Sequence, residues 1–300
     1  MLKIAWSEIY NHPLPEGHRF PMEKYDLLPK QLIHEGTVDK ENFFNPRKLV
    51  DQEILAVHQA SYWEKLQQLD FTRQEERRSG FPISHELVER EITINAGTIQ
   101  CAEFALEYGI SMNIAGGTHH AFSDRAEGFC LLNDIAIASQ YLLDNKKARQ
   151  ILVVDLDVHQ GNGTAEIFRN ESSVYTFSMH GEHNYPLQKE ISDLDIPLKD
   201  GTDDQTYLSL LDTNLKALLD QLSPDFIFFQ SGVDVLMTDK LGRLGMSLEG
   251  CKRRDELVIS EAKKANIPLV ASMGGGYSKD IKDILEAHAN TYRTAQDIFF

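Results

Sequence analysis

The sequence contains few cysteines and no long apolar run. Its three cysteines, Cys101, Cys130 and Cys251, are odd in number and form no CxxC pair, so they indicate neither a disulfide framework nor a thiolate zinc site. No segment approaches the roughly 18 consecutive apolar residues of a membrane span. The first ten residues, MLKIAWSEIY, hold no apolar run long enough for a signal peptide. We therefore expect a soluble, cytoplasmic protein in a reducing compartment.

Basic residues are also scarce compared with acidic ones. The 300-residue chain has 30 Lys plus Arg against 46 Asp plus Glu, a formal net charge of −16. Such a surface repels nucleic acid and anionic membranes, which argues against both as partners. It attracts cationic partners such as lysine-rich peptides or polyamines, although acidity also serves simply to keep a protein in solution.

Repeats, low-complexity tracts and Gly/Ser linkers are absent, so we expect a single domain over residues 1–300. From about residue 85 onward, helical patterns alternate with short apolar runs, and Ser84 is the expected N-cap of the first helix. The expected strands are 111–117, 151–158, 174–179, 225–232 and 267–273, and the expected helices are 85–108, 131–143, 164–170, 206–222, 250–265 and 278–290. Apolar strands separated by helices predict an α/β fold whose parallel sheet is covered on both faces.

Polar side chains follow four of the expected strands. In open α/β folds the chemistry gathers beyond the carboxyl ends of the strands. The residues placed there are His119, His120, Asp155, Asp157, His159, Asn162, Asp234 and Tyr277. Isolated charges in apolar surroundings are costly unless they are paired or bound to a metal, so this edge of the sheet is the candidate functional site.

Asp157 and His159 are the first candidate metal ligands. They are two residues apart on the expected strand 151–158, so their side chains are predicted to point to the same face. With Asp234 they make three protein ligands and leave one position open for water, as catalytic zinc requires. The alternative is a buried polar network in which the aspartates cap helices and His159 is a core histidine. The four polar strand ends together favour the metal site.

The tandem histidines and the tyrosine are candidates for catalysis. An imidazole titrates near neutral pH, so His119 or His120 could take a proton from water and return it to a leaving amine, although either could instead be a further ligand. Tyr277 follows three glycines, which permit close approach of the backbone. Its hydroxyl could stabilise an oxyanion, or the tyrosine could simply be packed in a turn.

These motifs together resemble the histone deacetylase family, within the wider arginase/deacetylase fold. The resemblance runs from about His12 to the final expected helix and rests on GGTHHA (116–121), GFC (128–130), Asn133-Asp134, DLDVHQGNG (155–163), SGVDVLMTDKLGRLGMS (231–247) and GGGY (274–277). It implies a single-domain, three-layer α/β/α fold with a central, mainly parallel eight-stranded sheet. It also implies zinc-dependent hydrolysis of N-acyl-lysine amides. DxDxHQGNG, SDR (123–125) and KRRDE (252–256) are most similar to class IV, and PEGHRFPMEKY (15–25) is similar to its bacterial members.

The resemblance assigns roles to individual residues. It implies Asp157, His159 and Asp234 as ligands of one catalytic Zn²⁺ (with Fe²⁺ as the alternative ion), and His119 and His120 as the acid/base pair, facing Asp155 and Asn162. Tyr277 would polarise the scissile carbonyl. The implied substrate contacts are Gly128, Phe129, Tyr185 and Gly275. A structural K⁺ site is implied near Asp155, Asp157, His159, Ser178 and Met179, and Arg19 is matched to the arginine of an internal acetate channel.

Two departures from related patterns sharpen this expectation. The partner of His120 is the amide Asn162 where the classical branches carry an aspartate, so the pKa of His120 is expected to be lower than that of a carboxylate-backed histidine. Class IV carries Asn at this position. The two-manganese arginase pattern requires aspartates at positions that are here Gly161 and Gly232. The sequence thus predicts a single catalytic metal and no ureohydrolase.

Several alternatives stay open at this point. The same catalytic residues would serve a small-molecule amidohydrolase such as an acetylpolyamine deacetylase, although no long insertion narrows the expected entrance. A catalytically silent binding protein is disfavoured because every ligand and the tyrosine are present. The acyl chain length, the physiological substrate, whether acyl-lysine protein or small N-acyl amine, and the oligomeric state are not indicated by the sequence.

Overall fold

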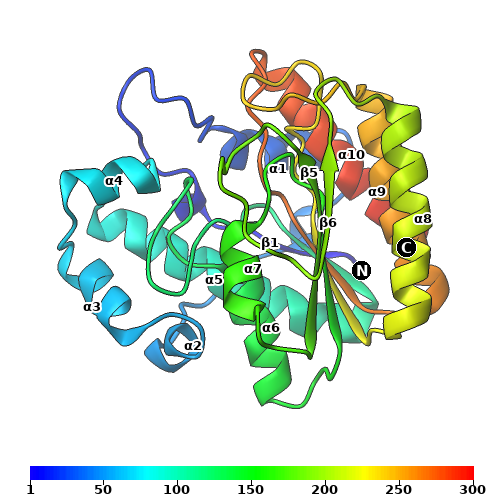
Figure 1. Ribbon diagram of the computed structural model, residues 1–300. Helices are drawn as coiled ribbons and strands as arrows, with labels where there is room; N and C mark the ends of the chain where they lie inside the picture. The colour runs from blue at the N-terminus through cyan, green and yellow to red at the C-terminus, as the bar shows by residue number, and fades with distance from the viewer.

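The computed structural model describes residues 1–300 and contains one eight-stranded sheet (Figure 1). The strand order is β2-β1-β3-β8-β7-β4-β5-β6, and every neighbouring pair is parallel. The strands are β1 (Lys3–Ala5), β2 (Phe43–Phe44), β3 (Ile110–Asn113), β4 (Ile151–Asp155), β5 (Val174–Gly181), β6 (Leu194–Leu198), β7 (Phe226–Gln230) and β8 (Leu269–Ser272). The expected α/β fold is confirmed, with a sheet that is wholly parallel.

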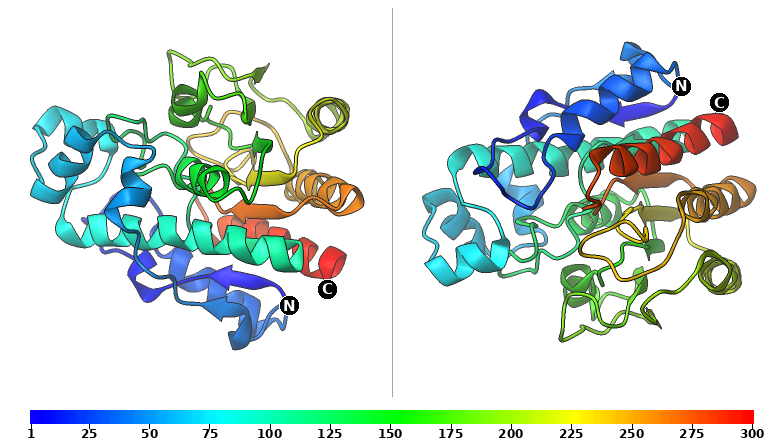
Figure 2. Two further views of the ribbon diagram at one scale, coloured as in Figure 1. Left: turned by 90° about the horizontal axis from the view of Figure 1, so that it is seen from below. Right: turned by 90° about the horizontal axis from the view of Figure 1, so that it is seen from above.

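Helices cover both faces of the sheet and make three layers (Figures 1 and 2). The helices are α1 (Lys24–His34), α2 (Asp51–Leu55), α3 (Ala60–Gln68), α4 (Arg73–Ser79), α5 (His85–Tyr108), α6 (Asp134–Asp144), α7 (Asn162–Phe168), α8 (Asp204–Leu222), α9 (Leu248–Ala265) and α10 (Ile281–Phe299), with 3-10 turns at Glu8–Tyr10 and Lys40–Asn42. Helices α1, α8, α9 and α10 pack in a row on one face, and α5, α6 and α7 lie on the other.

The central strands are apolar because both of their faces are covered. Every residue of β4 (ILVVD) and β7 (FIFFQ) is buried, as parallel strands between two helical layers require. These two strands are hydrogen-bonded to each other with Asp155 opposite Gln230. The loops that follow them therefore begin side by side at the centre of the sheet's carboxyl edge.

Three strands and four helices fall outside the predicted pattern. Strands β1 and β2 have only three and two residues, and the edge strand β6 is half-buried, so none of them has the long apolar run of an interior strand. Helices α1 to α4 precede residue 85, where the sequence pattern was not assigned. Ser84 does cap α5, because its side chain accepts the Leu87 N–H at 3.2 Å.

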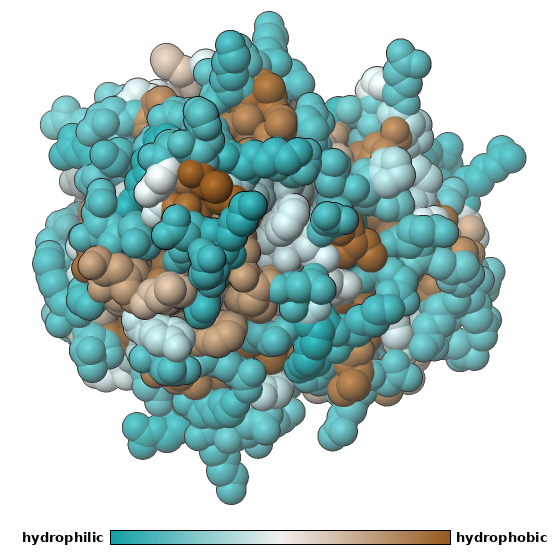
Figure 3. All heavy atoms as spheres, turned by 180° about the vertical axis from the view of Figure 1, so that it is seen from behind, coloured by the Kyte–Doolittle hydropathy of each residue, from teal (hydrophilic) through white to brown (hydrophobic).

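The face seen from behind is mostly hydrophilic (Figure 3). Seen from behind, the apolar side chains form separate patches among polar ones (Figure 3). None of the helices has both the length and the apolar character that crossing a membrane demands.

Candidate metal centre and active site

The segment after β4 is a loop, which corrects the expected strand 151–158. The strand ends at Asp155, and two side chains explain why. Asp155 Oδ1 accepts the Asp157 N–H at 3.2 Å, and Asp157 Oδ1 accepts the His159 N–H at 3.0 Å. Such bonds to the backbone two residues on are turn-forming and compete with the strand ladder. Asp157 and His159 therefore converge through consecutive turns and not through the alternation of a strand.

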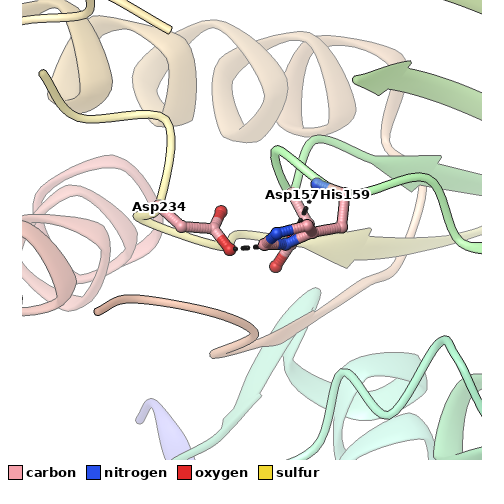
Figure 4. A group of neighbouring side chains, drawn as sticks. All are labelled: Asp157, His159 and Asp234. Atoms are coloured by element: carbon pink, nitrogen blue, oxygen red, sulfur yellow. Dashed lines mark hydrogen bonds and ion pairs between the residues drawn. The ribbon is translucent and has the colours of Figure 1, made fainter. Parts of the chain in front are cut away.

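Three potential metal ligands meet in this loop and the one after β7. Asp157, His159 and Asp234 are all buried, and one ligand atom from each lies within 4.8 Å of the others (Figure 4). His159 Nδ1 is 3.1 Å from Asp157 Oδ1 and 3.1 Å from Asp234 Oδ2. The other carboxylate oxygens are held by the backbone: Gly275 N–H donates to Asp157 Oδ2 at 2.8 Å, and Val158 N–H donates to Asp234 Oδ1 at 2.9 Å. Each carboxylate therefore directs its other oxygen toward the space between the three side chains, where a metal ion would bind.

The electrostatics of the three groups suit a bound cation. Burial and the charge of Asp157 raise the pKa of Asp234 to about 7. Burial disfavours a charged imidazole, but Asp157 and Asp234 outweigh it and raise the pKa of His159 to about 10. Both shifts have the same origin, which is two carboxylates held close together out of water. Two carboxylates and one imidazole are a donor set that suits Zn²⁺ and leaves a fourth position open, so the residues fit the metal.

Neighbouring glycines pack closely against the carboxylates of the site. A Cβ atom at Gly232 would collide with the Asp157 carboxylate, and one at Gly161 would collide with the Asp155 carboxylate. A Cβ at Gly275 would meet the carboxylates of Asp157 and Asp234. A side chain at Gly161 or Gly232 would therefore have to displace a carboxylate of the site.

The tandem histidines lie beside the metal site with different partners. His119 Nδ1 is 2.7 Å from Asp155 Oδ2, and His120 Nδ1 is 2.6 Å from Asn162 Oδ1. Burial opposes a charge on His119, but Asp155 and Asp157 outweigh it and raise its pKa. Burial and then the imidazoles of His119 and His159 lower the pKa of His120 well below the usual value. His119 therefore favours its protonated form, whereas His120 favours its neutral form.

Tyr277 lies above the metal site with its ring 6.5 Å from that of His159, centroid to centroid. Its N–H donates to Asp239 Oδ2 at 2.6 Å, and the other oxygen of Asp239 accepts from Leu241 and Gly242, both at 2.8 Å. Burial and the nearby carboxylates of Asp234 and Asp157 raise the pKa of Tyr277 well above its usual value. Its phenol is thus held as a neutral hydrogen-bond donor.

Aromatic side chains line a passage from the surface to this point. A cavity of about 400 Å³ at the mouth includes Gly128, Phe129, Tyr185, His120 and His159 in its lining. The Tyr185 ring is perpendicular to that of His120 at 5.0 Å. Phe129 has φ +69°, a strained backbone conformation of the kind that clusters at functional sites.

A smaller cavity of about 40 Å³ lies on the inner side. It is lined by Gly275, by Asp157 and His159 and by Arg90, which is buried and donates from Nε to Tyr10 O at 2.8 Å. The match of Arg19 to an internal-channel arginine is wrong. Arg19 is exposed at the outer mouth, where its guanidinium lies 4.9 Å from the centre of the Phe129 ring.

The residues suggested for potassium lie on β4, on β5 and in the loop after β4. Asp155 of β4 pairs in register with Ser178 of β5, and the buried Met179 follows it. The Ser178 hydroxyl is 2.9 Å from His180 Nδ1. Asp157 and His159 lie in the loop directly after Asp155, so all five expected residues occupy one corner of the sheet.

Sequence reasoning missed the residue that ties the two ligand loops together. Arg254 of α9 is fully buried, and its guanidinium donates to Gly232 O at 2.6 Å, to Leu156 O at 3.2 Å and to Ser231 O at 3.2 Å. Asp255 pairs with it at 2.8 Å. A signal was present, because Arg254 sits among Cys251, Val258 and other buried positions on the apolar face of the helix.

Two more buried charged residues hold the loop of the tandem histidines and the glycine run before Tyr277. The Asp134 carboxylate accepts from Thr118 N–H at 2.8 Å and from Thr98 Oγ1 at 2.7 Å, which fixes the start of the histidine loop. Lys24 Nζ donates to Gly274 O at 3.0 Å, in the glycine run before Tyr277. Only the fold shows these contacts, since each joins segments far apart in the sequence.

Comparison with known proteins gives a consistent family and fold. Residues 18–292 match the family model described as histone deacetylase domain. The chain is 45% identical to an uncharacterized protein of Picosynechococcus sp. over 99% of both chains, and 30% identical to histone deacetylase 2 of Arabidopsis thaliana over 87% of this chain and 70% of that protein. It is similar in fold to a crystal structure of an HDAC homologue complexed with SAHA (TM-score 0.85, 23% identity, 99% of this chain and 84% of that one). The HDAC homologue from Aquifex aeolicus gives a TM-score of 0.83 at 22% identity, over 98% of this chain and 84% of that one.

Proposed function

The chain belongs to the histone deacetylase family, and on that premise we propose that it is a zinc-dependent enzyme that hydrolyses the amide of N-acyl-lysine. Membership makes it a hydrolase of the deacetylase type. The observation that carries the finer proposal is the buried convergence of Asp157, His159 and Asp234 at the inner end of an aromatic passage. A passage lined by Phe129 and Tyr185 suits the four methylenes of a lysine side chain.

The chain's own groups account for the steps of amide hydrolysis. A zinc ion at the triad would polarise the substrate carbonyl and make water more acidic. His120, whose lowered pKa keeps it neutral, takes the proton from water as general base. Tyr277 donates a hydrogen bond to the carbonyl oxygen as negative charge develops there. His119, whose raised pKa favours its proton, helps return a proton to the departing amine.

The acyl group in this proposal is short. The inner cavity of about 40 Å³ has room for roughly three water-sized groups, which is close to the size of an acetyl group. A long fatty acyl chain would require this region to open. Acetyl-lysine is therefore the substrate that the geometry favours, and an acyl-length series on one lysine peptide tests it.

Four further parts of the proposal rest on smaller observations. Asn162 beside His120 supports a class IV relationship, and the corner formed by Asp155, Ser178 and Met179 supports a structural K⁺ ion. The single sheet supports one catalytic domain over residues 1–300. All three cysteines are free thiols, in keeping with the cytoplasm as the proposed location.

The function is tested with the Tyr277→Phe variant and with metal analysis. We expect purified protein to hold about one zinc or iron ion per chain, and its hydrolysis of an acetyl-lysine peptide to stop on chelation and return on adding Zn²⁺ or Fe²⁺. Loss of the Tyr277 hydroxyl should lower kcat by about 100-fold or more without changing the thermal unfolding curve. A variant as active as the wild type would contradict the assigned role, and protein that cannot be loaded with metal would favour a silent binding protein.

A further inference from the structure

Four arginines surround the mouth of the passage. The lining of the 400 Å³ cavity includes Arg19, Arg77, Arg78 and Arg243, and it includes no aspartate or glutamate. Building on the proposed function, we propose that this arginine rim binds carboxylates on the amine side of the substrate, so that the preferred substrates are acyl-lysines flanked by acidic residues.

The arginine rim carries charge that the protein itself leaves largely unbalanced. Arg19, Arg77 and Arg78 are exposed and pair with no carboxylate. Arg243 is paired with Asp200 at 3.3 Å, but both side chains are about half exposed, at 59% and 44%. Exposed guanidiniums keep their five donors available for a bidentate carboxylate.

The position of α4 makes the basic rim part of the passage. Arg78 O accepts the Gly128 N–H at 3.0 Å, and Ser79 O accepts the Phe129 N–H at 2.6 Å. The end of the helix is thereby joined to the wall that faces the substrate, so Arg77 and Arg78 are held at the mouth. Arg19 reaches the same wall from the N-terminal segment by stacking on the Phe129 ring.

This local charge is opposite to that of the whole chain. The formal net charge is −16, so a cationic peptide or polyamine is attracted to the protein at a distance. At the mouth it would meet four guanidiniums without a lining acid, and like-charge contacts oppose binding there. The structure therefore argues against the acetylpolyamine alternative and against lysine-rich segments as preferred substrates.

The geometry also assigns which half of the substrate carries the anion. The mouth cavity shares His120, His159, Phe129 and Tyr277 with the small inner cavity. An acyl group that reaches the inner cavity leaves the lysine backbone outside, level with the arginine rim. Carboxylates of flanking Asp or Glu residues fall there, as does the α-carboxylate of a free acyl-lysine. Four separate arginines around a wide mouth favour several carboxylates over one.

Three acetyl-lysine peptides of equal length test the proposal, with glutamate, glutamine or lysine on both sides of the acetyl-lysine. We expect kcat/KM to fall in that order, by about tenfold from the acidic to the basic peptide. The preference should shrink at 0.5 M salt, since salt screens exposed charges. Free acetyl-lysine, as a fourth substrate, shows whether its single α-carboxylate is enough for recognition or whether several carboxylates are needed. Equal kcat/KM values for the three peptides would overturn the proposal.

Variants locate the effect on the arginine rim. Arg77→Gln/Arg78→Gln, or Arg19→Gln if the double variant does not fold, should reduce the acidic-to-basic ratio at least about threefold. Arg253→Gln removes one positive charge, as Arg19→Gln does, from an exposed residue of α9 on the opposite flank of the molecule, and should keep the wild-type ratio. A ratio unchanged in the rim variants would contradict the proposal.

Binding measurements separate this proposal from the proposed function. Fluorescence anisotropy of the labelled peptides with the full chain gives the order of Kd without hydrolysis. Tighter binding of the acidic peptide in the absence of turnover supports the arginine rim while the proposed activity fails. Turnover of all peptides with equal Kd values supports the activity and overturns the role of the rim.

Discussion

At the scale of one residue, the two hydrogen bonds of Asn162 explain why an amide lies beside His120. Its Oδ1 accepts from His120 Nδ1 at 2.6 Å while its Nδ2 donates to Glu127 Oε1 at 3.0 Å. Glu127 also accepts from the Tyr185 hydroxyl. An amide can accept on one side and donate on the other, which an ionised carboxylate cannot, so Asn162 links the candidate base to the wall of the passage. An aspartate would face Glu127 with a like charge.

Asn162→Asp should therefore impair activity although it supplies the carboxylate of the classical branches. We expect kcat/KM for acetyl-lysine peptide to fall by about tenfold, because a charge-assisted hydrogen bond is replaced by repulsion between the introduced carboxylate and that of Glu127.

A second variant controls for the altered charge. Asn162→Asp/Glu127→Gln restores a donor opposite the new carboxylate, and we expect it to regain most of the lost kcat/KM. If the double variant is no better than the single one, the link between His120 and Glu127 is not what Asn162 provides.

At the scale of elements, the metal site depends on two loops and the helix behind them. The loops after β4 and β7 carry all three candidate ligands, and α9 reaches both through the guanidinium of Arg254. Asp255, beside it, accepts from Thr291 Oγ1 of α10 at 2.7 Å. The spacing of Asp157 and Asp234 is thus fixed by a helix that contributes no ligand.

Arg254→Met should destabilise the protein and weaken metal binding. Removing one partner of a buried pair costs about 3–5 kcal/mol, to be measured as the free energy of unfolding in urea. Loss of groups that orient metal ligands lowers affinity by about 10- to 100-fold, measured by zinc competition with a chelator. Arg253→Met, on the exposed side of the same helix, should change neither quantity.

A double variant separates two effects of Arg254: its ion pair with Asp255 and its hydrogen bonds to the two ligand loops. Arg254→Met/Asp255→Asn removes the unpaired carboxylate and should regain part of the stability, but zinc affinity should stay low. Recovery of both together would mean that only the buried charge matters.

At the scale of the whole molecule, buried neutral histidines link stability to pH. His58 Nε2 accepts the Asn133 N–H at 3.0 Å, so its Nδ1–H donates to Phe122 O at 3.0 Å. His58 lies just before α3. Its two hydrogen bonds join this segment to the loop that follows the tandem histidines and to Asn133, the N-cap of α6. Burial lowers the pKa of His58 from 6.5 to about 4, and protonation would turn a second N–H against Asn133.

We expect the free energy of unfolding to fall as the pH is lowered through this range. The folded pKa of His58 lies below the unfolded one, so the unfolded chain binds the proton first; the contribution of His58 is complete above pH 6.5 and is lost toward pH 4. For His58 alone this amounts to about 2 kcal/mol between pH 7.5 and pH 5. Urea unfolding at the two pH values measures it.

Two glutamine variants identify the group responsible. His58→Gln can make both hydrogen bonds without titrating, so its loss of stability between the two pH values should be smaller than that of the wild type by this amount. His85→Gln, at an exposed position, should lose as much as the wild type. An equal loss in His58→Gln would assign the pH dependence to other groups.

The sequence by itself determined the class of fold and the residues that gather at the sheet edge. Apolar runs such as ILVVD and FIFFQ are long enough to be read as covered parallel strands, and the parallel direction brings their polar ends to one edge. It also excluded the aspartates of a two-metal site at Gly161 and Gly232. Short or half-exposed strands such as β6 lack that signal, because their stability comes from neighbours in the sheet.

Only the tertiary structure decided how the ligands converge and what the mouth recognises. Turns, and not strand alternation, aim Asp157 and His159, and the buried Arg254 sets them against Asp234. Arg19 and Arg77, 58 positions apart in the chain, meet at the same cavity. The net charge is a sum over all residues and does not say where in space the charges lie. The acidic composition therefore could not reveal the arginine rim, which forms only when distant segments of the chain pack together.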